Sequence, residues 1–325
     1  MASTCDDQQA NEAGKPLLSL RRERGWADPY LYLFQEFWVP PIYIKEVNKF
    51  QNYFQAKDSD VVVASLLKSG TTWLKALTFA IVNRQHFPSP LLTSNPHQLV
   101  PYFELIFRGD IHDRILHLSK VTEPRIFGTH ISFSSLPKSV TESNCKIIYI
   151  CRNPFDNFVS AWTFSNNINS ESLSALTLEE AFEMYCNGIV PFGPWWSHIL
   201  GYWHESMAKP NKVLFLKYED LKENINLHVK RIAEFLGLPF TQEEESNNGL
   251  MESIIELCSF EKMKDLKVNK SGTVNFSGLI ENKFFFRKGE VGDWVNYFSP
   301  SMIEKLSNII EEKLSGSGLS FKMHW

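Results

Sequence analysis

Four short apolar runs, rich in β-branched residues, recur along the chain and predict the strands of a sheet. They cover residues 61–67, 125–129, 146–151 and 212–217. Apolar positions in these runs are continuous rather than alternating, which is typical of parallel strands that helices cover on both faces. The pattern therefore predicts a buried parallel sheet.

Helical signals fill the stretches between and after these runs. The expected helices cover residues 74–82, 177–187, 220–236 and 300–314. The second opens with a capping box between Thr177 and Glu180, and the third stops at Gly237. The last has Ser299 as its N-cap and Pro300 at its first position. Strands that alternate with helices predict an α/β fold with a parallel central sheet flanked by helices, and a binding site at the carboxyl ends of the strands.

The chain before the first strand divides into two segments. Residues 1–24 are expected to form a disordered leader, whereas residues 25–54 are crowded with aromatic side chains. Pro40 and Pro41 interrupt this aromatic segment, which makes it too irregular for one helix. Neither an internal repeat nor a long linker divides the rest, so residues 25–325 are expected to form a single domain.

Composition narrows the class of protein. The chain has 325 residues, of which 43% are hydrophobic and 22% are charged, as in ordinary globular proteins. A net charge of −4 argues against a nucleic-acid partner and against a general role at a membrane surface. Any anion site must therefore be a local cluster of Lys and Arg.

Cysteines and histidines give no sign of a metal site. The five cysteines lack C-x-x-C spacing, and the nine histidines lack metal-ligand spacing. Residues 1–15 lack the apolar core of a signal peptide, and no uncharged run approaches the roughly 18 to 20 residues that span a bilayer. The sequence therefore predicts a cytoplasmic protein with no metal and no membrane partner.

The most informative segment is residues 66–73, Leu-Leu-Lys-Ser-Gly-Thr-Thr-Trp, which joins the first predicted strand to the first predicted helix. A short loop in this setting aims the backbone N–H groups of the first helical turn at one point, where they hold an oxyanion. Lys68 adds a full positive charge, and Thr71 and Thr72 add hydroxyl donors. The segment predicts an anion-binding strand–loop–helix.

This loop differs from the nucleotide-binding loop G-x-x-x-x-G-K-[ST]. Lys68 and Ser69 match the end of that pattern, but no glycine lies between Gly25 and Gly70. Trp73 has two readings that the sequence leaves open: its indole stacks on a purine, or it packs in the core.

The loop resembles the phosphosulfate loop of the cytosolic sulfotransferases, whose donor is 3'-phosphoadenosine 5'-phosphosulfate (PAPS). Further matching segments follow in the family's order at residues 129–130, 152–160 and 287–294. The resemblance runs from about Trp26 to the C-terminus. It is greatest to the plant members, as in residues 95–97 and 231–236.

The resemblance implies in-line sulfuryl transfer, in which catalysis is mostly positioning and charge stabilisation. It implies that Lys68 stabilises the leaving oxygen and that His130 takes the proton of the acceptor hydroxyl. Ser160 is implied to bind the 3'-phosphate and to hold Lys68 away from the sulfonate until the acceptor arrives. Without the other matching segments, a structural role would be the alternative for His130 and for Ser160.

The resemblance also implies a set of residues that bind the donor PAPS and its product PAP. The set consists of Lys68, Ser69, Gly70, Thr71, Thr72, Trp73, Arg152, Ser160, Tyr218, Phe260, Arg287, Lys288 and Gly289. For Tyr218 and Phe260 the alternative is core packing, and for Arg152 it is an ion pair with Asp156. Cys258 stands where family members often carry Thr, so one contact to the donor is expected to be missing.

Three further positions depart from the family pattern. Leu67 replaces a common Pro, which predicts a looser loop, and Gly128 replaces a Lys of many animal members, which removes a cation near the sulfonate. The dimer motif of animal members is mostly absent, with only Glu304 retained. A monomer or weak dimer is therefore expected.

The sequence says less about the acceptor than about the donor. Expected pocket walls are the aromatic N-terminal segment, residues 102–103, Phe133, residues 162–164 and residues 192–196. Aromatic walls suit a small, mostly apolar alcohol or phenol such as a flavonoid, a steroid or another specialised metabolite. Two competing functions are a P-loop-type small-molecule kinase, which the missing glycine disfavours, and a catalytically silent PAP-binding homologue, which the intact Lys68, His130 and Ser160 disfavour.

Overall fold

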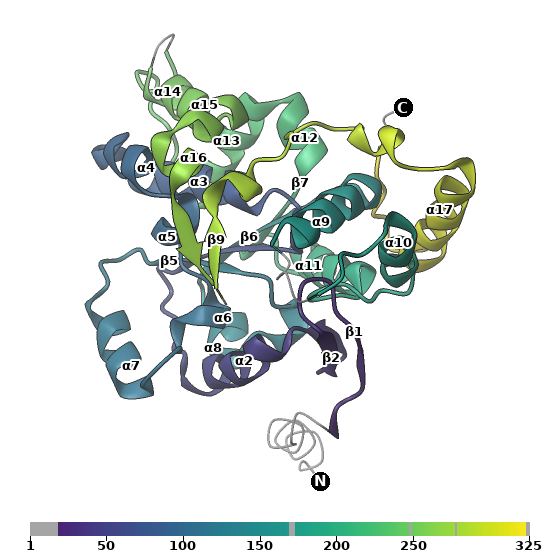
Figure 1. The fold of residues 1–325 in the computed structure, drawn as a ribbon. Helices are drawn as coiled ribbons and strands as arrows, with labels where there is room; N and C mark the ends of the chain where they lie inside the picture. Colours follow the sequence, from purple (N-terminus) through teal and green to yellow (C-terminus); the bar gives the residue numbers. More distant parts are fainter. Residues whose placement is uncertain (1–18, 169–172, 247–248, 277, 323–325) are drawn as a thin grey trace.

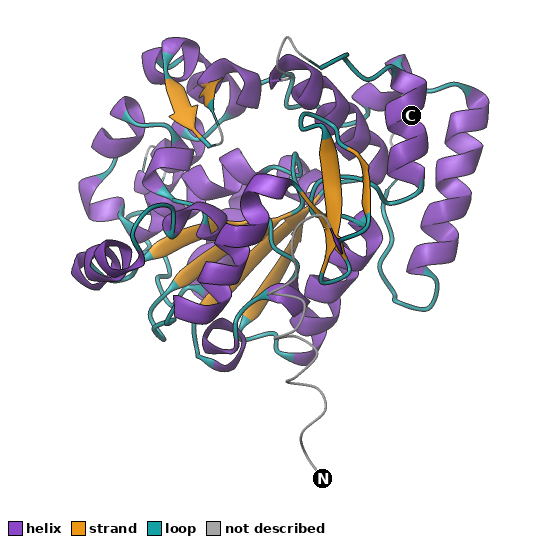
Figure 2. Ribbon diagram, turned by 60° about the horizontal axis from the view of Figure 1, so that its bottom comes forward, coloured by secondary structure: helices purple, strands orange, loops and turns teal. Residues whose placement is uncertain are grey.

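The computed structural model describes residues 19–168, 173–246, 249–276 and 278–322. Its centre is a parallel sheet in the order β5-β4-β6-β7, with helices on both faces (Figures 1 and 2). These strands are β4 (Val61–Ser65), β5 (Ile126–Thr129), β6 (Lys146–Cys151) and β7 (Val213–Lys217). All four expected strands are present, and the α/β fold with a parallel central sheet is confirmed.

Alternate residues of the central strands face two separate cores. Val62 and Ala64 of β4 belong to one cluster of buried side chains, and Val61 and Val63 belong to the other. This is the result of the period of two in a strand. It explains why the sequence of a doubly covered strand reads as one apolar run.

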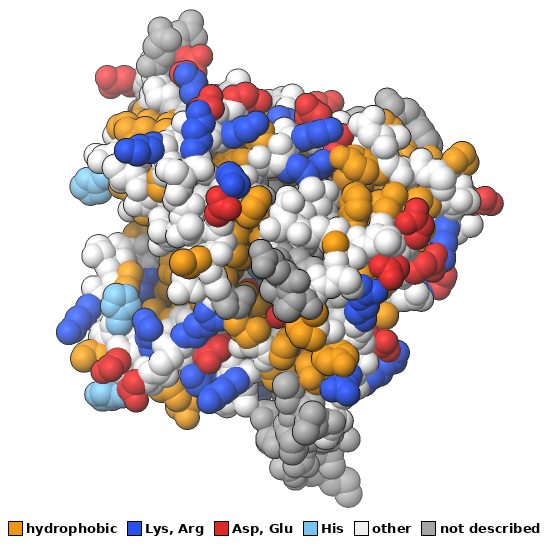
Figure 3. Space-filling model, in the orientation of Figure 1, with side chains coloured by type: hydrophobic (Ala, Val, Ile, Leu, Met, Phe, Trp, Pro, Cys, Tyr) orange, Lys and Arg blue, Asp and Glu red, His pale blue; other side chains and the backbone are white. Residues whose placement is uncertain are grey.

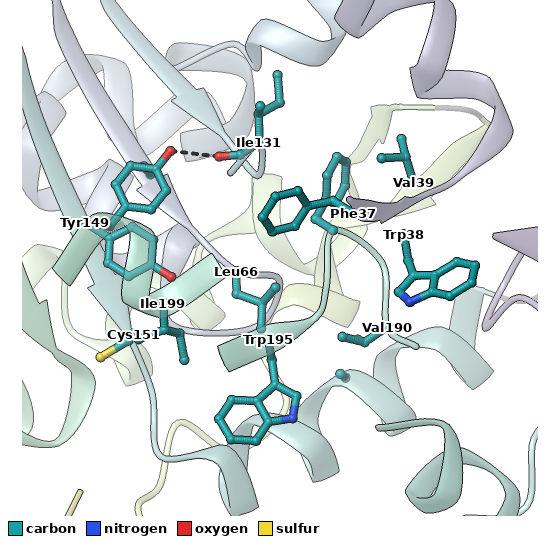
Figure 4. Close-up of a cluster of buried hydrophobic side chains, with 14 of the residues drawn as sticks. Phe37, Trp38, Val39, Leu66, Ile131, Tyr149, Cys151, Val190, Trp195 and Ile199 are labelled. Carbon is teal, nitrogen blue, oxygen red and sulfur yellow. Dashed lines mark hydrogen bonds between the residues drawn. The ribbon is translucent and has the colours of Figure 1, made fainter. Parts of the chain in front are cut away.

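The two faces of the sheet are covered by different helices. Side chains of α3 (Thr71–Val82), α13 (Ile225–Phe235) and α14 (Leu250–Leu257) build one core. Side chains of α2 (Pro41–Tyr53), α9 (Pro154–Ile168), α10 (Leu178–Cys186), α11 (Trp195–Ala208) and α17 (Pro300–Leu314) build the other. Figure 4 shows part of the second core, where Tyr149, Ile199 and Trp195 lie close to Leu66.

Shorter elements surround this frame. The remaining helices are α4 (Ser89–Thr93), α5 (Pro96–Leu99), α6 (Phe103–Ile106), α7 (Ile111–Lys120), α8 (Lys138–Glu142), α12 (Tyr218–Glu223), α15 (Phe260–Asp265) and α16 (Lys267–Ser271). The remaining strands are β1 (Arg22–Arg24), β2 (Tyr30–Phe34), β3 (Phe37–Val39), β8 (Thr273–Asn275) and β9 (Leu279–Glu281). The first three form an antiparallel sheet, and the last two form a hairpin.

Several expected boundaries differ from the structure. The first strand ends at Ser65 rather than at residue 67, and α3 begins at Thr71 rather than at residue 74. The helix expected over residues 220–236 is two helices, because Asn224 ends α12 and its side chain accepts the backbone N–H of Leu227 as the N-cap of α13. The leader expected up to residue 24 is too long, because β1 already pairs with β2. Residues 1–18 lie outside the described part of the chain.

Candidate active site

A cavity of about 860 Å³ lies where the four central strands end. Each strand is followed by a residue that lines the cavity: Lys68 after β4, His130 after β5, Arg152 after β6 and Tyr218 after β7. The expected site at the carboxyl ends of the strands is therefore present as a cavity. Lys and Arg side chains gather over α12 to α16 on the upper part of the molecule in Figure 3.

The loop between β4 and α3 has the backbone geometry of an anion cradle. Lys68 has φ +62° and Gly70 has φ +107°, so the chain turns sharply before the first N–H groups of α3. A left-handed lysine is costly and marks a backbone that its surroundings hold in place. Asn157 of α9 supplies part of that hold, since its amide donates to the carbonyl of Leu67 at 2.7 Å and to the hydroxyl of Ser69 at 3.1 Å. The Leu67 position is thus anchored from α9.

Hydroxyl groups of the loop have buried partners. The hydroxyls of Ser65 and Thr71 lie 2.6 Å apart, and Thr72 Oγ1 lies 2.9 Å from His97 Nε2. Nδ1 of His97 is buried and has no hydrogen-bond partner among the described residues. Burial holds the pKa of His97 well below its ordinary value, so this ring is neutral.

Lys68 lies in an environment that disfavours its charge. Its Nζ is 3.9 Å from the ring centroid of Phe164. Burial, followed by the charges of Arg152 and Arg287, lowers the pKa of Lys68 to about 7. An anion bound in the cavity would reverse this effect, because it would compensate all three cations.

Arg152 is held at the cavity wall by neutral groups. Its Nη2 donates to the carbonyl of Glu290 at 2.6 Å, and its guanidinium lies 4.7 Å from the ring centroid of Tyr218. Asp156 instead accepts the backbone N–H of Gly292 at 2.7 Å. The alternative ion pair between Arg152 and Asp156 does not occur among the ion pairs of the described residues. The guanidinium charge is therefore not neutralised by that carboxylate.

Arg287 and Lys288 share one buried carboxylate. Both side chains pair with Asp293, Lys288 through its Nζ at 2.6 Å. Asp293 is 4% exposed, and it keeps two like charges together at the cavity edge. The carbonyl of Gly289 accepts the hydroxyl of Tyr218 at 2.9 Å, which fixes the backbone of the basic segment against β7.

The hydrogen bond of His130 assigns its tautomer. Nδ1 lies 2.8 Å from the carbonyl oxygen of Ser65, and a carbonyl can only accept, so Nδ1 carries the proton. Nε2 is then left with a lone pair. Burial lowers the pKa of His130 to about 3, which keeps the ring neutral at neutral pH.

Aromatic residues line the cavity at the ends of β7 and α14. Trp73 lies edge-on to Tyr218, with ring centroids 5.5 Å apart, and both rings line the cavity together with Phe260. Trp73 is only partly buried, which favours the reading of an accessible indole over one in the core. Cys258 is fully buried and does not line this cavity.

The cavity collects the residues that the sequence singled out for donor binding and catalysis, with one exception. Ser69 does not line it, because its hydroxyl is buried against Asn157 and its backbone N–H donates to the carbonyl of Leu66. The others line it, and they are Lys68, Gly70, Thr71, Thr72, Trp73, His130, Arg152, Ser160, Tyr218, Phe260, Arg287, Lys288 and Gly289. Segments far apart in the sequence thus meet in one place.

The expected acceptor walls are right only in part. Tyr102, Phe164 and Phe192 line the cavity as expected. The N-terminal segment contributes Ala27, Asp28, Pro29, Pro40, Ile42 and Tyr43. Phe103 and Trp195 are core side chains, and Phe133 packs against Tyr202 instead.

Sequence reasoning missed several wall residues. They are His97, Glu104, Ile168, Phe276, Leu279 and Phe285. Phe276 lies in the turn of the β8–β9 hairpin, and Phe285 lies just after it in a run of three phenylalanines, where the sequence does not indicate which ring faces the cavity. Glu104 was detectable only as an acid in an otherwise apolar stretch.

The space beside Gly128 holds the end of a lysine side chain, and burial lowers the pKa of this lysine, Lys75, well below its ordinary value. Lys75 of α3 is fully buried, its Nζ donates to the carbonyl of Val100 at 2.8 Å, and it lies 3.1 Å from the ring centroid of Tyr102. A Cβ at Gly128 would come within 2.4 Å of that Nζ. Loss of a lysine on β5 is therefore accompanied by a lysine that reaches the same space from α3.

Acid is expected to destabilise the fold through its buried neutral histidines. Burial lowers the pKa of His198 to about 4 and that of His97 further below the ordinary value of 6.5. Below pH 6.5 these histidines bind protons in the unfolded chain but stay neutral in the folded chain. The free energy of unfolding therefore falls as the pH falls from 6.5 toward 4. For His198 the loss at pH 5.5 is ~1.4 kcal/mol. Urea unfolding at pH 7.5, 6.5 and 5.5 measures this loss. The free energy of unfolding of His198→Gln should depend less steeply on pH than that of the parent. An equal pH dependence in both proteins would contradict the assignment to His198.

Two structural features are absent from the described residues. None of the helices there is both long enough and apolar enough to cross a membrane. No group of three or more His, Cys, Asp or Glu side chains in those ranges is arranged to hold a metal ion.

The chain is similar to a known family over most of its length. The sulfotransferase domain matches residues 58–318. Cytosolic sulfotransferase 15 of Arabidopsis thaliana is 51% identical over 98% of this chain and 89% of its own length.

Solved structures agree with this match. An Arabidopsis thaliana protein assigned as a steroid sulphotransferase superposes with a TM-score of 0.74 and 38% identity, covering 99% of both chains. Mouse sulfotransferase SULT7A1 complexed with PAP superposes with a TM-score of 0.70 and 28% identity, covering 88% of this chain and 95% of the mouse chain.

Proposed function

The chain belongs to the sulfotransferase family, among its plant cytosolic members, and from this premise we propose that it transfers a sulfuryl group from PAPS to the hydroxyl of a small, mostly apolar acceptor. One observation carries the proposal. A single cavity joins the anion cradle around Lys68 to the neutral imidazole of His130 and to a wall of aromatic side chains.

The donor end of the cavity suits a molecule with a phosphosulfate, a second phosphate and a purine. The cradle of Thr71 and Thr72 offers N–H and hydroxyl donors to the phosphosulfate. Arg152, Arg287 and Lys288, with Ser160 beside them, offer charge-assisted hydrogen bonds to the 3'-phosphate. The mouse relative that superposes on the chain was solved with PAP, which supports this choice of donor.

The adenine would be held by the aromatic group at the same end. Trp73, Tyr218 and Phe260 line the cavity there, and flat rings of this kind bind a purine by stacking and edge contacts. PAPS supplies an activated sulfuryl group on a good leaving group, and the chain's own residues supply position and charge.

His130 and Lys68 divide the chemistry. His130 accepts the proton of the acceptor hydroxyl at Nε2, while the oxygen of that hydroxyl forms a bond to sulfur and the bond from sulfur to the bridging oxygen breaks. Lys68 in its protonated form stabilises the negative charge that builds on the bridging oxygen, which leaves with PAP. The neutral state of His130 in the free protein is the state that this step needs.

The acceptor end favours flat, mostly apolar alcohols and phenols. Tyr102 and Phe192 provide aromatic surface beside His130, and Phe276 packs against Tyr102. Flavonoids, steroids and comparable specialised metabolites present such surface with a hydroxyl. A cytoplasmic location fits the names of the relatives. A monomer or weak dimer fits the sparse dimer motif.

Transfer of labelled sulfate from PAPS tests the function directly. A panel of flavonols, hydroxysteroids, hydroxy acids, phenols and desulfo-oximes is incubated with the full chain, with and without EDTA. Labelled product at equal rates in both conditions is expected. Loss of turnover in EDTA would contradict metal-free transfer. No product and no PAP release across the panel would contradict the proposal when PAP itself also fails to bind.

Replacing Gly289 with alanine is expected to weaken PAP binding about tenfold. Gly289 has φ +68°, and an added Cβ would come within 2.5 Å of the Phe260 ring, which must shift from the position where it lines the cavity. Calorimetric titration with PAP measures the effect. Gly237→Ala is the matched control, because Gly237 has φ +71° with nothing within 4 Å of the added carbon. Equal affinity in both variants would remove Phe260 from the donor site.

A further inference from the structure

The backbone that carries His130 is held by side chains from other parts of the fold. The N–H of His130 donates to the carboxylate of Glu104, and its carbonyl accepts from Nε2 of His198 at 2.9 Å. One residue later, the carbonyl of Ile131 accepts the hydroxyl of Tyr202 at 2.7 Å, which Figure 4 shows as a dashed line. The loop after β5 is thus fixed on both sides of the imidazole.

His198 is bound at both ring nitrogens. Since the carbonyl of His130 can only accept, Nε2 of His198 carries the proton, and Nδ1 accepts the hydroxyl of Tyr149 at 2.9 Å. His198 and Tyr149 are both fully buried. Each polar atom of this pair therefore has its partner, and the pair connects β6 to the His130 loop through α11.

We propose that His198 is a positioning residue for His130, holding its carbonyl so that the imidazole stays oriented for proton removal, and that Tyr149 fixes the tautomer that His198 needs. This inference rests on the proposed role of His130 as the base. His198 does not line the cavity, so it acts only through His130.

Packing alone does not account for a histidine at this position. The ring of His198 lies edge-on to Phe37 at 6.4 Å between centroids and close to Tyr202 at 5.6 Å. A phenylalanine would fill the same space. It would leave the carbonyl of His130 buried without the His198 donor and would remove one hydrogen bond of the Tyr149 hydroxyl, a cost that the surrounding backbone relieves by moving. Movement of that carbonyl also moves the bond from His130 Nδ1 to Ser65, which is the contact that orients the ring.

Two substitutions at His198 distinguish the effect of its hydrogen bonds on His130 from the effect of its packing in the core. His198→Phe keeps the volume and removes both hydrogen bonds, and it is expected to lower kcat about 10- to 100-fold with acceptor KM and PAP affinity changed less than about threefold. His198→Gln keeps one N–H donor and one acceptor at similar spacing, and it should restore most of kcat. Equal activity of the two variants would overturn the proposal.

A matched control lies on the same helix. Trp203 donates from Nε1 to the carbonyl of Ser317 at 2.8 Å, and neither residue lines the cavity. Trp203→Phe removes one partly buried donor of α11 without touching the His130 loop, so its kcat should stay close to that of the parent. A loss as large as that of His198→Phe would point to general damage of α11 and would overturn the proposal.

A double-mutant cycle separates this inference from the proposed function. If His198 acts through His130, then His198→Phe costs nothing further in a chain that already carries His130→Ala. If the two substitutions lower kcat by factors that multiply in the double variant, His198 is not a positioning residue for His130. If His130→Ala alone stays fully active, the role of His130 as the base is wrong instead. If His198→Phe does not fold, Tyr149→Phe replaces it. That variant keeps His198 and its bond to the carbonyl of His130 but removes the hydroxyl that Nδ1 of His198 accepts. About a threefold to tenfold lower kcat is expected, and an unchanged kcat would count against the proposal.

Discussion

Replacing His130 with alanine is expected to lower kcat by about 10² to 10⁴, because the acceptor hydroxyl then loses the group that removes its proton. The dissociation constant for PAP should change little, since His130 belongs to the acceptor side of the cavity. Nδ1 bonded to Ser65 and a neutral ring with Nε2 available are what a base requires. Steady-state rates with the acceptor found in the panel, together with PAP titration, measure both quantities.

A second buried histidine of the cavity, His97, is the control for His130→Ala. His97 also lines the cavity and is also neutral, so a general effect of losing an imidazole there would appear in His97→Ala as well. The loss in His97→Ala is expected to be clearly smaller than the loss in His130→Ala. Unchanged turnover in His130→Ala, or a larger loss at His97, would move the base away from His130.

Replacing Lys68 with methionine is expected to lower kcat by about 10² to 10³, which is the usual effect of removing one stabilising donor at a developing charge. The same change should abolish a pH dependence of PAP binding. With a pKa of about 7 in the empty cavity, Lys68 is already protonated below pH 7 and takes up a proton on binding above it. Affinity for PAP should therefore be flat below pH 7 and should fall about tenfold per pH unit above it.

Calorimetry in two buffers of different ionisation enthalpy counts that proton. The parent should take up close to one proton per PAP at pH 8, and Lys68→Met should take up none. Lys222→Met is a suitable control, because Lys222 also lines the cavity but lies on α12, where its Nζ is 5.9 Å from the centroid of the Trp73 ring. Proton uptake that persists in Lys68→Met would assign the titration to another group.

The site was predictable where a functional residue follows directly on a regular element. Lys68, His130 and Arg152 each come after a strand whose apolar run is visible in the sequence, and parallel strands end at one edge of the sheet. The end of α12 at Asn224 was visible in the sequence as well, since Asn is a common N-cap residue. It was overlooked because helical patterns continue on both sides of it.

The acceptor walls were harder because they come from irregular segments. Tyr102 lines the cavity, whereas its neighbour Phe103 stacks on Phe50 in the core with ring centroids 4.3 Å apart. Without the period of a helix or strand, the sequence does not indicate which of two adjacent aromatic residues faces inward. Glu104 reaches the His130 loop only because long-range packing brings α6 beside β5.

The buried side chain of Lys75 and the missing side chain at Gly128 exclude each other's alternatives. Because a Cβ at residue 128 would overlap the end of Lys75, the two positions cannot both carry long side chains. Relatives with a lysine on β5 should consequently show a short residue at the α3 position, and the two sites should covary. In protein engineering, a lysine at residue 128 should be tolerated only in combination with a smaller residue at 75. The lysine could therefore be moved from helix to strand by a paired exchange but not by either change alone.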